Sequence, residues 1–278
     1  MRLTVRQALD QGTRLFEEGA VGAPRLTAEV LLCHALQRDR SYLYAHGDDE
    51  LSELAWIHYG RYLHERLQGK PTQYITKTQE WYGRPFRVSP DVLIPRPETE
   101  HVIEVALART PRRGRTIDIG CGSGAIGVTW QLETGLPVCL SDISTRALAV
   151  ARGNAQALGA RVDCVACDLG AAFGSGAFDI VLSNPPYIPD PERETLQREV
   201  RDFEPAVALF GGPTGVEIYT RLLADAGRVL KPGGWIVMEI GYQAQERITA
   251  MLRDGAWTAI EVAQDLAGWP RVVSARRS

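Results

Sequence analysis

Lysine is scarce in this sequence, and basic charge is not in excess. Only Lys70, Lys77 and Lys231 are lysines among the 31 basic residues, and the formal net charge is −3. We attribute the many arginines to a compositional bias. Proteins that bind nucleic acid through its phosphates usually present a positive field, so we expect no direct nucleic-acid partner.

Long apolar runs are missing too. The first residues, MRLTVRQALDQG, lack the apolar core of a signal peptide, and no run reaches the roughly 18 apolar residues of a membrane span. We therefore expect no membrane partner. The five cysteines are an odd number and do not indicate the disulfide framework of a small secreted protein. A reducing, cytoplasmic location is predicted.

The sequence contains no clear set of metal ligands. Cys164 and Cys167 have the C-x-x-C spacing, but they lie in a strand-like segment, where residues three apart face opposite sides. No second pair completes a zinc site. His58 and His64 are six apart on an expected helix and do not share a face. We predict no metal cofactor.

The periodicity of apolar residues divides the chain into two parts. Spacings of three and four residues predict helices over residues 4–19, 25–37 and 52–69. Ser52 is a suitable start for the last of them. We expect residues 1–72 to form a small helical bundle. The second expected domain, 73–278, begins with a proline-rich, hairpin-like connector that turns at Gly83.

From residue 115 strand-like and helix-like segments alternate. Apolar runs such as Ile180-Val181-Leu182 lack polar alternation, as expected of parallel strands covered on both faces. This pattern predicts an α/β fold with a doubly wound, mostly parallel sheet. Ser144 is a candidate N-cap of one helix. The KPGG stretch at 231–234 is predicted to be a turn, and two short strands are expected near the C-terminus.

A glycine-rich loop follows the first strand of this sheet and opens a helix. It reads DIGCGSG, from Asp118 to Gly124. Glycines let a ligand approach the backbone, and the helix N-terminus offers free N–H groups. Asp142 ends the next strand about 20 residues later, where a carboxylate can bind ribose hydroxyls. NAD and S-adenosylmethionine fit these features equally, because Gly122, Gly124 and Gly127 also match G-x-G-x-x-G.

Three features favour S-adenosylmethionine. Asp118, just before the loop, is a poor neighbour for a pyrophosphate, whereas a sulfonium cofactor tolerates a nearby acid. Asp168 ends the third strand, where it can accept a hydrogen bond from the adenine amino group. The fourth strand ends in Asn184-Pro185-Pro186-Tyr187, beside the crevice in which cofactors bind in such sheets.

The double proline gives the fourth strand a stiff end. The side-chain oxygen of Asn184 and the carbonyl oxygen of Pro185 are two acceptors, which suit the two donors of a planar –NH₂ group. The ring of Tyr187 can pack against that group. An amide nitrogen is a poor nucleophile, because its lone pair is delocalised. Holding both hydrogens can direct the lone pair at an activated methyl group, and such alignment contributes ~7–11 kcal/mol in well-oriented systems.

The NPPY motif resembles that of amino-group methyltransferases of the class I S-adenosylmethionine fold, which act on DNA adenine or on protein glutamine. Longer stretches resemble one family among them, the HemK/PrmC peptide chain release factor glutamine methyltransferases. They are EWYGRPFRV, LIPRPETE, DIGCGSGAIG, SNPPYIP and FEPAVALFGGPTGVEIYTRLL. The likeness runs from about residue 20, with the stretch APRLTAEVLL, to the end of the chain.

The resemblance implies a seven-stranded, Rossmann-like sheet and N-terminal helices that help to dock the substrate. The reaction would methylate the glutamine of the Gly-Gly-Gln loop in class I release factors, giving N5-methylglutamine and S-adenosylhomocysteine. By motif position, the substrate amide would contact Asn184, Pro185, Pro186 and Tyr187, of which the first, second and fourth would be catalytic. The cofactor would contact Gly120, Cys121, Gly122, Ser123, Gly124, Asp142, Asp168, Leu169 and Asn184.

Some positions depart from the family pattern or have no assigned role. Leu169 stands where members often carry a bulky aromatic residue, so less stacking on the adenine is expected. Cys121 stands where threonine or serine is common. Arg96 and Glu98 would either shape the pocket entrance or form a structural salt bridge.

Other functions fit parts of the sequence. A methyltransferase of a ribosomal-protein glutamine would share NPPY, but its family differs after IPR, where this chain has PETE. A DNA adenine methyltransferase would need a basic face and a target recognition domain. An NAD-dependent oxidoreductase would leave NPPY unexplained, and an inactive scaffold would not need an intact cofactor loop. We favour the release factor methyltransferase.

Overall fold

The protein divides into two compact units. A computed structural model describes residues 3–111 and 113–278. The first unit ends at Lys77 and also contains Gln197–Phe203, and the second contains Thr78–Leu196 and Glu204–Ser278. The sequence predicted a boundary between residues 72 and 73, and nothing in it indicated that Gln197–Phe203 belongs with the N-terminal helices. No helix within the described ranges is both long and apolar enough to span a membrane.

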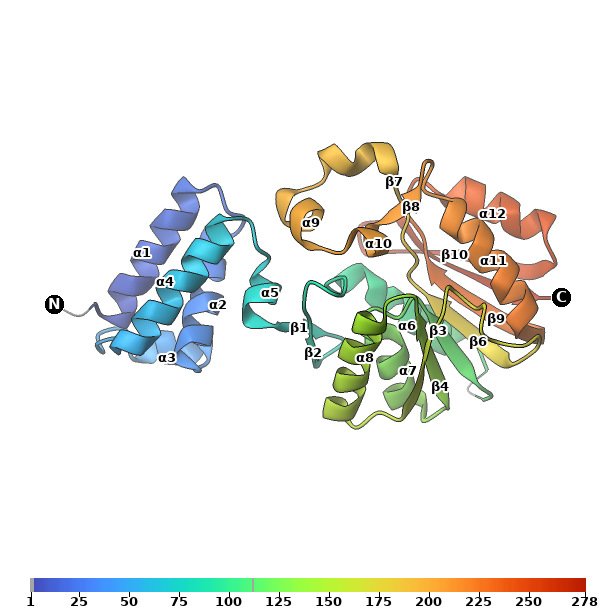
Figure 1. Ribbon diagram of the computed structural model, residues 1–278, viewed down its shortest axis with the longest axis horizontal. Helices are drawn as coiled ribbons and strands as arrows, with labels where there is room; N and C mark the ends of the chain where they lie inside the picture. Colours follow the sequence, from blue (N-terminus) through green and yellow to red (C-terminus); the bar gives the residue numbers. More distant parts are fainter. Residues whose placement is uncertain (1–2, 112) are drawn as a thin grey trace. The chain divides into compact units, whose positions relative to one another are not determined.

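The first unit is a bundle of helices with its own apolar core. Its helices are α1 (Val5–Glu18), α2 (Pro24–Leu36), α3 (Arg40–Ala45), α4 (Glu53–Leu67), α5 (Thr72–Thr76) and α9 (Arg198–Phe203) (Figure 1). The three helices predicted from periodicity are α1, α2 and α4. Ser52 caps α4 as predicted, since its hydroxyl accepts a hydrogen bond from Ala55 N at 3.2 Å.

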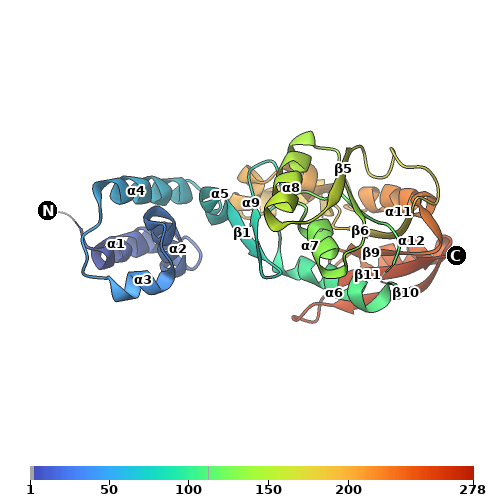
Figure 2. The ribbon, with the colours of Figure 1, turned by 90° about the horizontal axis from the view of Figure 1, so that it is seen from below.

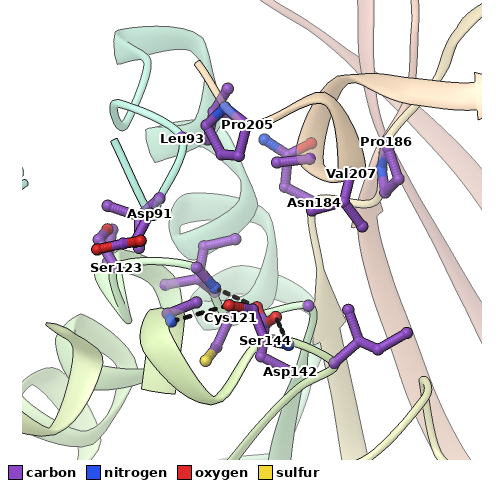
Figure 3. Close-up of a pocket in the computed structure, with 18 of the residues that line it drawn as sticks. Asp91, Leu93, Cys121, Ser123, Asp142, Ser144, Asn184, Pro186, Pro205 and Val207 are labelled. Carbon is purple, nitrogen blue, oxygen red and sulfur yellow. Dashed lines mark hydrogen bonds between the residues drawn. The ribbon is translucent and has the colours of Figure 1, made fainter. Parts of the chain in front are cut away.

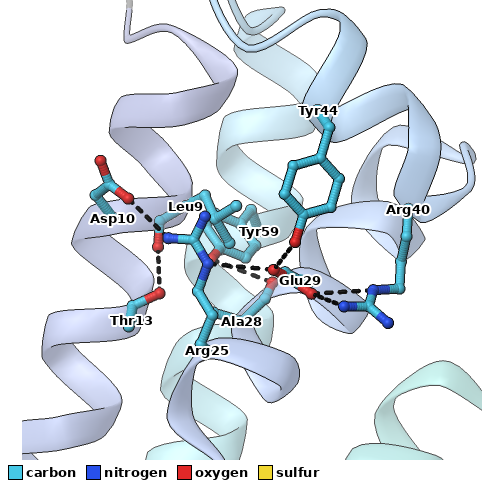
Figure 4. A network of polar contacts seen from close by, with 9 residues as sticks. All are labelled: Leu9, Asp10, Thr13, Arg25, Ala28, Glu29, Arg40, Tyr44 and Tyr59. Atoms are coloured by element: carbon cyan, nitrogen blue, oxygen red, sulfur yellow. Dashed lines mark hydrogen bonds and ion pairs between the residues drawn. The ribbon is translucent and has the colours of Figure 1, made fainter.

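A buried carboxylate connects three helices of this unit (Figure 4). Glu29 on α2, whose side chain is only 2% exposed, accepts hydrogen bonds from Arg40 Nη2 at 2.6 Å and Tyr44 Oη at 2.7 Å, both on α3. Arg25 Nε donates to the same carboxylate at 3.2 Å, and Arg25 Nη1 pairs with Asp10 on α1 at 2.8 Å. Because both oxygens have partners, as a buried charge requires, we interpret this network as structural.

The second unit begins with a β-hairpin. Strand β1 (Thr78–Trp81) pairs antiparallel with β2 (Arg84–Arg87). The two turn residues, Tyr82 and Gly83, have φ of 49° and 66°, as in the tight turns that favour glycine. The hairpin connector and its turn at Gly83 are therefore confirmed. The 3₁₀-helix η1 (Pro97–Thr99) and helix α6 (Glu100–Arg109) follow.

A seven-stranded sheet organises the second unit (Figure 1). The strand order is β10-β11-β9-β6-β3-β4-β5. The strands from β9 to β5 in that order are parallel, whereas β11 and β10 run antiparallel to their neighbours. The strands are β3 (Thr116–Ile119), β4 (Val138–Asp142), β5 (Val162–Ala166), β6 (Phe178–Ser183), β9 (Leu230–Glu239), β10 (Trp257–Gln264) and β11 (Pro270–Arg277).

Helices cover both faces of this sheet (Figures 1 and 2). On one face α6 packs with α7 (Ala125–Thr134) and α8 (Thr145–Leu158) over one apolar cluster. On the other face α11 (Glu217–Val229) and α12 (Gln245–Asp254) cover a second cluster. The predicted doubly wound α/β fold is thus confirmed. Ser144 caps α8 as predicted, accepting a hydrogen bond from Ala147 N at 3.2 Å.

One local expectation differs from the structure. The predicted turn at 231–234 lies within β9, where pairing with β6 skips from Leu230 to Trp235 and Gly233 has a φ of 78°. The turn is therefore a strand irregularity that leaves the sheet continuous. After β6 the chain forms β7 (Ile188–Pro189), η2 (Asp190–Thr195), α10 (Ala206–Leu209) and β8 (Phe210–Gly212), and β7 pairs with β8 outside the main sheet.

Candidate functional site

A pocket of about 270 Å³ lies at the carboxyl ends of the parallel strands (Figure 3). Its walls come from segment 91–99, the loop between β3 and α7, the ends of β4, β5 and β6, the start of α10, and α11. Ligands of doubly wound sheets bind at this edge, where successive crossovers diverge. All of these walls belong to the second unit.

The glycine loop shapes one side of the pocket. Gly120 and Gly122 have φ of 72° and 54°, and a Cβ atom at either position would meet nothing within 4 Å. The backbone is therefore open to a ligand here. Gly122 N donates to Asp142 Oδ2 at 2.9 Å, and Ser144 N donates to Asp142 Oδ1 at 2.9 Å. Asp142 thus fixes the loop to the end of β4, and burial raises its pKa.

Asp118 does not face this pocket, although the sequence suggested that it lies near the cofactor. It is completely buried under α7, and its Oδ2 accepts a hydrogen bond from Gly127 N at 2.8 Å. A Cβ atom on Gly127 would lie 2.3 Å from Leu140 Cδ2, so this third glycine permits close packing of helix on strand. Burial, assisted by the charge of Asp142, raises the pKa of Asp118 to about 7.

Asp168 and Leu169 follow β5 and line the pocket, as does Arg221 from α11. The Asp168 carboxylate pairs with the Arg221 guanidinium, and both side chains are about half exposed. A carboxylate has more acceptor sites than one arginine fills, so Asp168 keeps the capacity to accept a further donor. Leu169 has a φ of 47°, an unusual conformation for leucine.

Asn184 follows β6 and lines the opposite end of the pocket, together with Pro186 (Figure 3). Its Nδ2 donates a hydrogen bond to Thr99 Oγ1 at 3.1 Å. Among the residues that the structure describes, none donates a hydrogen bond to Asn184 Oδ1 or to the carbonyl oxygen of Pro185. The two acceptors expected to bind a planar amino group are therefore not occupied by the protein's own donors.

Tyr187 lies outside the pocket lining. Its hydroxyl donates to Glu239 Oε1 at 3.3 Å, and its ring packs against the backbone of Gly241, where a Cβ atom would lie 3.1 Å from Tyr187 Cδ2. Burial and the nearby Glu239 carboxylate raise the pKa of its hydroxyl. In this arrangement the ring supports the Asn184–Tyr187 segment, and its packing on a substrate amide stays a prediction.

The structure brings most of the predicted site residues to this one pocket. Nine of them line it: Gly120, Cys121, Gly122, Ser123, Asp142, Asp168, Leu169, Asn184 and Pro186. Three do not: Gly124, Pro185 and Tyr187. Gly124 is instead the N-cap of α7, with a φ of 81° and its N–H donating to Cys121 O at 2.8 Å. Its expected part in cofactor binding would therefore be indirect.

Sequence reasoning missed several residues of the site. Thr99, Pro205 and Val207 line the pocket without having been predicted. Arg96, for which the sequence offered a place at the pocket entrance or in a salt bridge, lines the pocket and also pairs with the buried carboxylate of Glu204. Glu204 Oε2 in addition accepts a hydrogen bond from Ile94 N at 3.0 Å. This pair attaches the segment before α10 to the pocket entrance, and no local pattern in the sequence indicated it.

The N-terminal and central parts of the chain match two described protein families. Residues 7–76 match the PrmC N-terminal domain, and residues 100–201 match the methyltransferase small domain. Similar solved structures include a methyltransferase from Pyrococcus furiosus, with a TM-score of 0.55 and 16% identity over 70% of this chain and 89% of that chain. Another is the 16S rRNA N2 G1207 methyltransferase of T. thermophilus in complex with AdoMet and guanosine. It has a TM-score of 0.53 and 16% identity over 72% of this chain and 50% of that one. At these identities the structures support the fold alone.

Curated relatives match over nearly the whole chain. A release factor glutamine methyltransferase from Koribacter versatilis is 44% identical and covers 99% of both chains. Proteins with the same name from Nitratidesulfovibrio vulgaris and Geobacter sulfurreducens are 40% and 39% identical, over 99% and 98% of this chain and 96% of each relative. The resemblance inferred from the motifs is confirmed, and the chain belongs to the release factor glutamine methyltransferase family.

Proposed function

We propose that the protein transfers a methyl group from S-adenosylmethionine to the side-chain amide of the glutamine in the Gly-Gly-Gln motif of class I release factors. The products are N5-methylglutamine and S-adenosylhomocysteine. One observation carries the proposal: a single pocket has the glycine loop with Asp142 and Asp168 at one end and Asn184 at the other. Membership of the release factor glutamine methyltransferase family supports the same substrate. The reaction would take place in the cytoplasm, where release factors act.

The residues present fit such a cofactor. The open backbone at Gly120 and Gly122 leaves room for it, and Asp142 retains lone pairs for ribose hydroxyls beside its two backbone donors. Asp168 and Leu169 would lie near the adenine. The bound cofactor supplies a methyl group on a sulfonium, which is electrophilic and transfers without a metal.

At the substrate end, Asn184 Oδ1 and the Pro185 carbonyl would each accept one N–H of the glutamine amide. Two fixed acceptors orient the nitrogen and counter the delocalisation of its lone pair. With S-adenosylmethionine bound, the nitrogen held by these two oxygens would take the methyl group from the sulfonium, leaving S-adenosylhomocysteine, and would then lose one proton to solvent. A strong general base is not required, because the nitrogen becomes acidic once it carries the positive charge.

Labelled S-adenosylmethionine tests this function. We expect label in a class I release factor and none in the same factor with its loop glutamine changed to alanine. Duplex DNA and ribosomal proteins serve as the competing substrates. The proposal is wrong if label enters the glutamine-free variant, or only DNA, or only a ribosomal protein. The N-terminal helices are proposed to dock the release factor, so deleting Met1–Lys77 should raise KM for the factor more than it affects cofactor binding.

A further inference from the structure

The oxygen and the nitrogen of the Asn184 side-chain amide have opposite hydrogen-bonding roles. Its oxygen accepts hydrogen bonds, and its –NH₂ group only donates them. A substrate amide that approaches with its N–H groups requires the oxygen. A rotation of the Asn184 amide by half a turn would present a donor instead and repel the substrate, so the site needs something that fixes this rotation.

Thr99 contacts the nitrogen side of that amide. Asn184 Nδ2 donates to Thr99 Oγ1 at 3.1 Å, and Thr99 Oγ1 donates to Glu239 Oε2 at 2.5 Å. A hydroxyl has one proton. While the Glu239 carboxylate takes that proton, the Thr99 oxygen can only accept from Asn184. The order of donors therefore runs from Asn184 through Thr99 to Glu239.

The three residues joined by these hydrogen bonds are held in place by three separate elements. Thr99 ends η1, Glu239 ends β9 and Asn184 follows β6. Thr99 and Glu239 are 4% and 2% exposed, so water competes little for their hydrogen bonds. The second oxygen of Glu239 accepts from the Tyr187 hydroxyl at 3.3 Å. The Glu239 carboxylate thus binds Tyr187 directly and Asn184 through Thr99.

We propose that Thr99 and Glu239 are positioning residues for methyl transfer, which hold the Asn184 amide with its oxygen available to the substrate nitrogen. The inference rests on the proposed function and deepens it, because neither residue belongs to the NPPY motif. It assigns the two residues to the orientation of Asn184, not to contact with the reacting atoms.

Protonation of Glu239 would reverse the direction of the hydrogen bonds that join Glu239, Thr99 and Asn184. A protonated carboxyl can donate to Thr99, whose hydroxyl is then free to donate to the oxygen of Asn184. Burial raises the pKa of Glu239 to about 6, against the opposing hydrogen bond from Thr99. The other groups that face it are Glu98, Tyr187 and Arg271, and Tyr219 donates to its backbone oxygen at 3.2 Å. Turnover should therefore fall as the pH falls through about 6.

The composition of the chain allows a direct test without substrate. Asn154 and Asn184 are its two asparagines, so a protein labelled with ¹⁵N in asparagine side chains gives two –NH₂ signals. Asn154 is an internal reference, because its Nδ2 donates to Arg87 O at 3.0 Å and Ser123 O at 2.9 Å. We expect Thr99→Val to speed hydrogen exchange at the Asn184 amide by at least about tenfold, the effect of losing one hydrogen bond, and to leave Asn154 unchanged. Thr99→Ser should keep the slow exchange.

Kinetics supply the second readout. Thr99→Val should lower kcat by at least about tenfold, with cofactor Kd within roughly twofold of wild type, and Thr99→Ser should restore most of kcat. Thr129→Val is the matched control: Thr129 is buried on α7 away from the pocket, and its hydroxyl has no partner among the described residues. Glu239→Gln, whose carbonyl still accepts from Thr99, should lose the decline of kcat near pH 6.

Three results would overturn the inference: equal exchange at Asn184 in wild type and Thr99→Val, equal impairment of Thr99→Val and Thr99→Ser, or the same acid limb in wild type and Glu239→Gln. Failure of the proposed function would look different. The wild-type enzyme would then not label the release factor, whereas the exchange experiment would still decide how Asn184 is held.

Discussion

Replacing Asp118 by asparagine should change how the stability of the second unit depends on pH. Asp118 is completely buried under α7, and its Oδ1 has no hydrogen-bond partner among the described residues. The ionised carboxylate is therefore poorly solvated, and the protonated form is preferred in the fold. Asparagine imitates that neutral form, and its oxygen can still accept the hydrogen bond from Gly127 N.

The magnitude follows from the shift of the pKa from 3.8 to about 7. A raised carboxyl pKa means that the folded protein binds the proton more tightly than the unfolded chain does. The stability that this group contributes is therefore complete below pH 4 and is lost as the pH rises to 7. Each pH unit in that window corresponds to about 1.4 kcal/mol. From pH 5 to pH 8, the free energy of unfolding of Asp118→Asn should therefore rise by about 2–3 kcal/mol relative to that of the wild type.

Urea unfolding at pH 5, 6, 7 and 8 measures this difference. Tryptophan fluorescence reports chiefly on the second unit, which contains Trp81, Trp130, Trp235, Trp257 and Trp269. Asp142 and Glu239 also have raised pKa values, but they titrate in both proteins and largely cancel in the comparison. Thr129→Val is the control, since its offset from wild type should not vary with pH. A constant offset for Asp118→Asn across the same range would refute the reasoning.

Three further changes test other parts of the molecule. Asn184→Ala should lower the rate of methyl transfer by at least about 100-fold, as loss of a transition-state contact does. Its affinity for the cofactor, measured by calorimetry, should be nearly unchanged. Equal losses of rate and affinity would assign Asn184 to cofactor binding or to the fold. Gly127→Ala places a Cβ atom 2.3 Å from Leu140 Cδ2 and should lower the free energy of unfolding by about 1–3 kcal/mol, so an unchanged Tm would contradict the packing. Glu29→Ala removes the buried carboxylate that joins Tyr44 to two half-exposed arginines, Arg25 and Arg40, and should lower the free energy of unfolding of the first unit by about 1–3 kcal/mol. Hydrogen exchange at the backbone amides of α1 and α2 measures this change, and a loss below about 0.5 kcal/mol would show that the network matters little.

Features of the fold that depend on neighbouring residues could be predicted from the sequence. Ser52 and Ser144 cap helices through hydrogen bonds to residues three positions ahead, and the turn at Gly83 needs only a positive φ. Helix α12 was not predicted, although it is ten residues long. Only three of its residues, Ile248, Thr249 and Leu252, are buried among many charged ones, and the helix packs against β10 and α11. The attachment of Gln197–Phe203 to the first unit likewise depends on contacts across the chain.

The candidate site divides in the same way. The glycine loop and the residues that end β4, β5 and β6 were predictable, because parallel strands bring their carboxyl ends to one edge. The buried carboxylates were not. Glu204 accepts a hydrogen bond from Ile94 N, and Glu239 accepts one from Thr99 Oγ1. The partners are 110 and 140 residues apart in sequence. A glutamate that will be buried by distant partners looks in sequence like any surface glutamate. The inward placement of Asp118 escaped prediction for a related reason, since its neighbour Gly127 is known only once α7 has packed.

The two unoccupied acceptors at Asn184 and Pro185 also bear on how far the reaction can proceed. Under the proposed function, an unmodified glutamine side chain has one N–H for each oxygen. A monomethylated side chain retains a single N–H, so one buried acceptor would face a methyl group and lose its partner, at a cost of about 1–3 kcal/mol. The same geometry that binds the substrate would thus weaken the hold on the product, which favours its departure and limits the enzyme to one methyl group per glutamine.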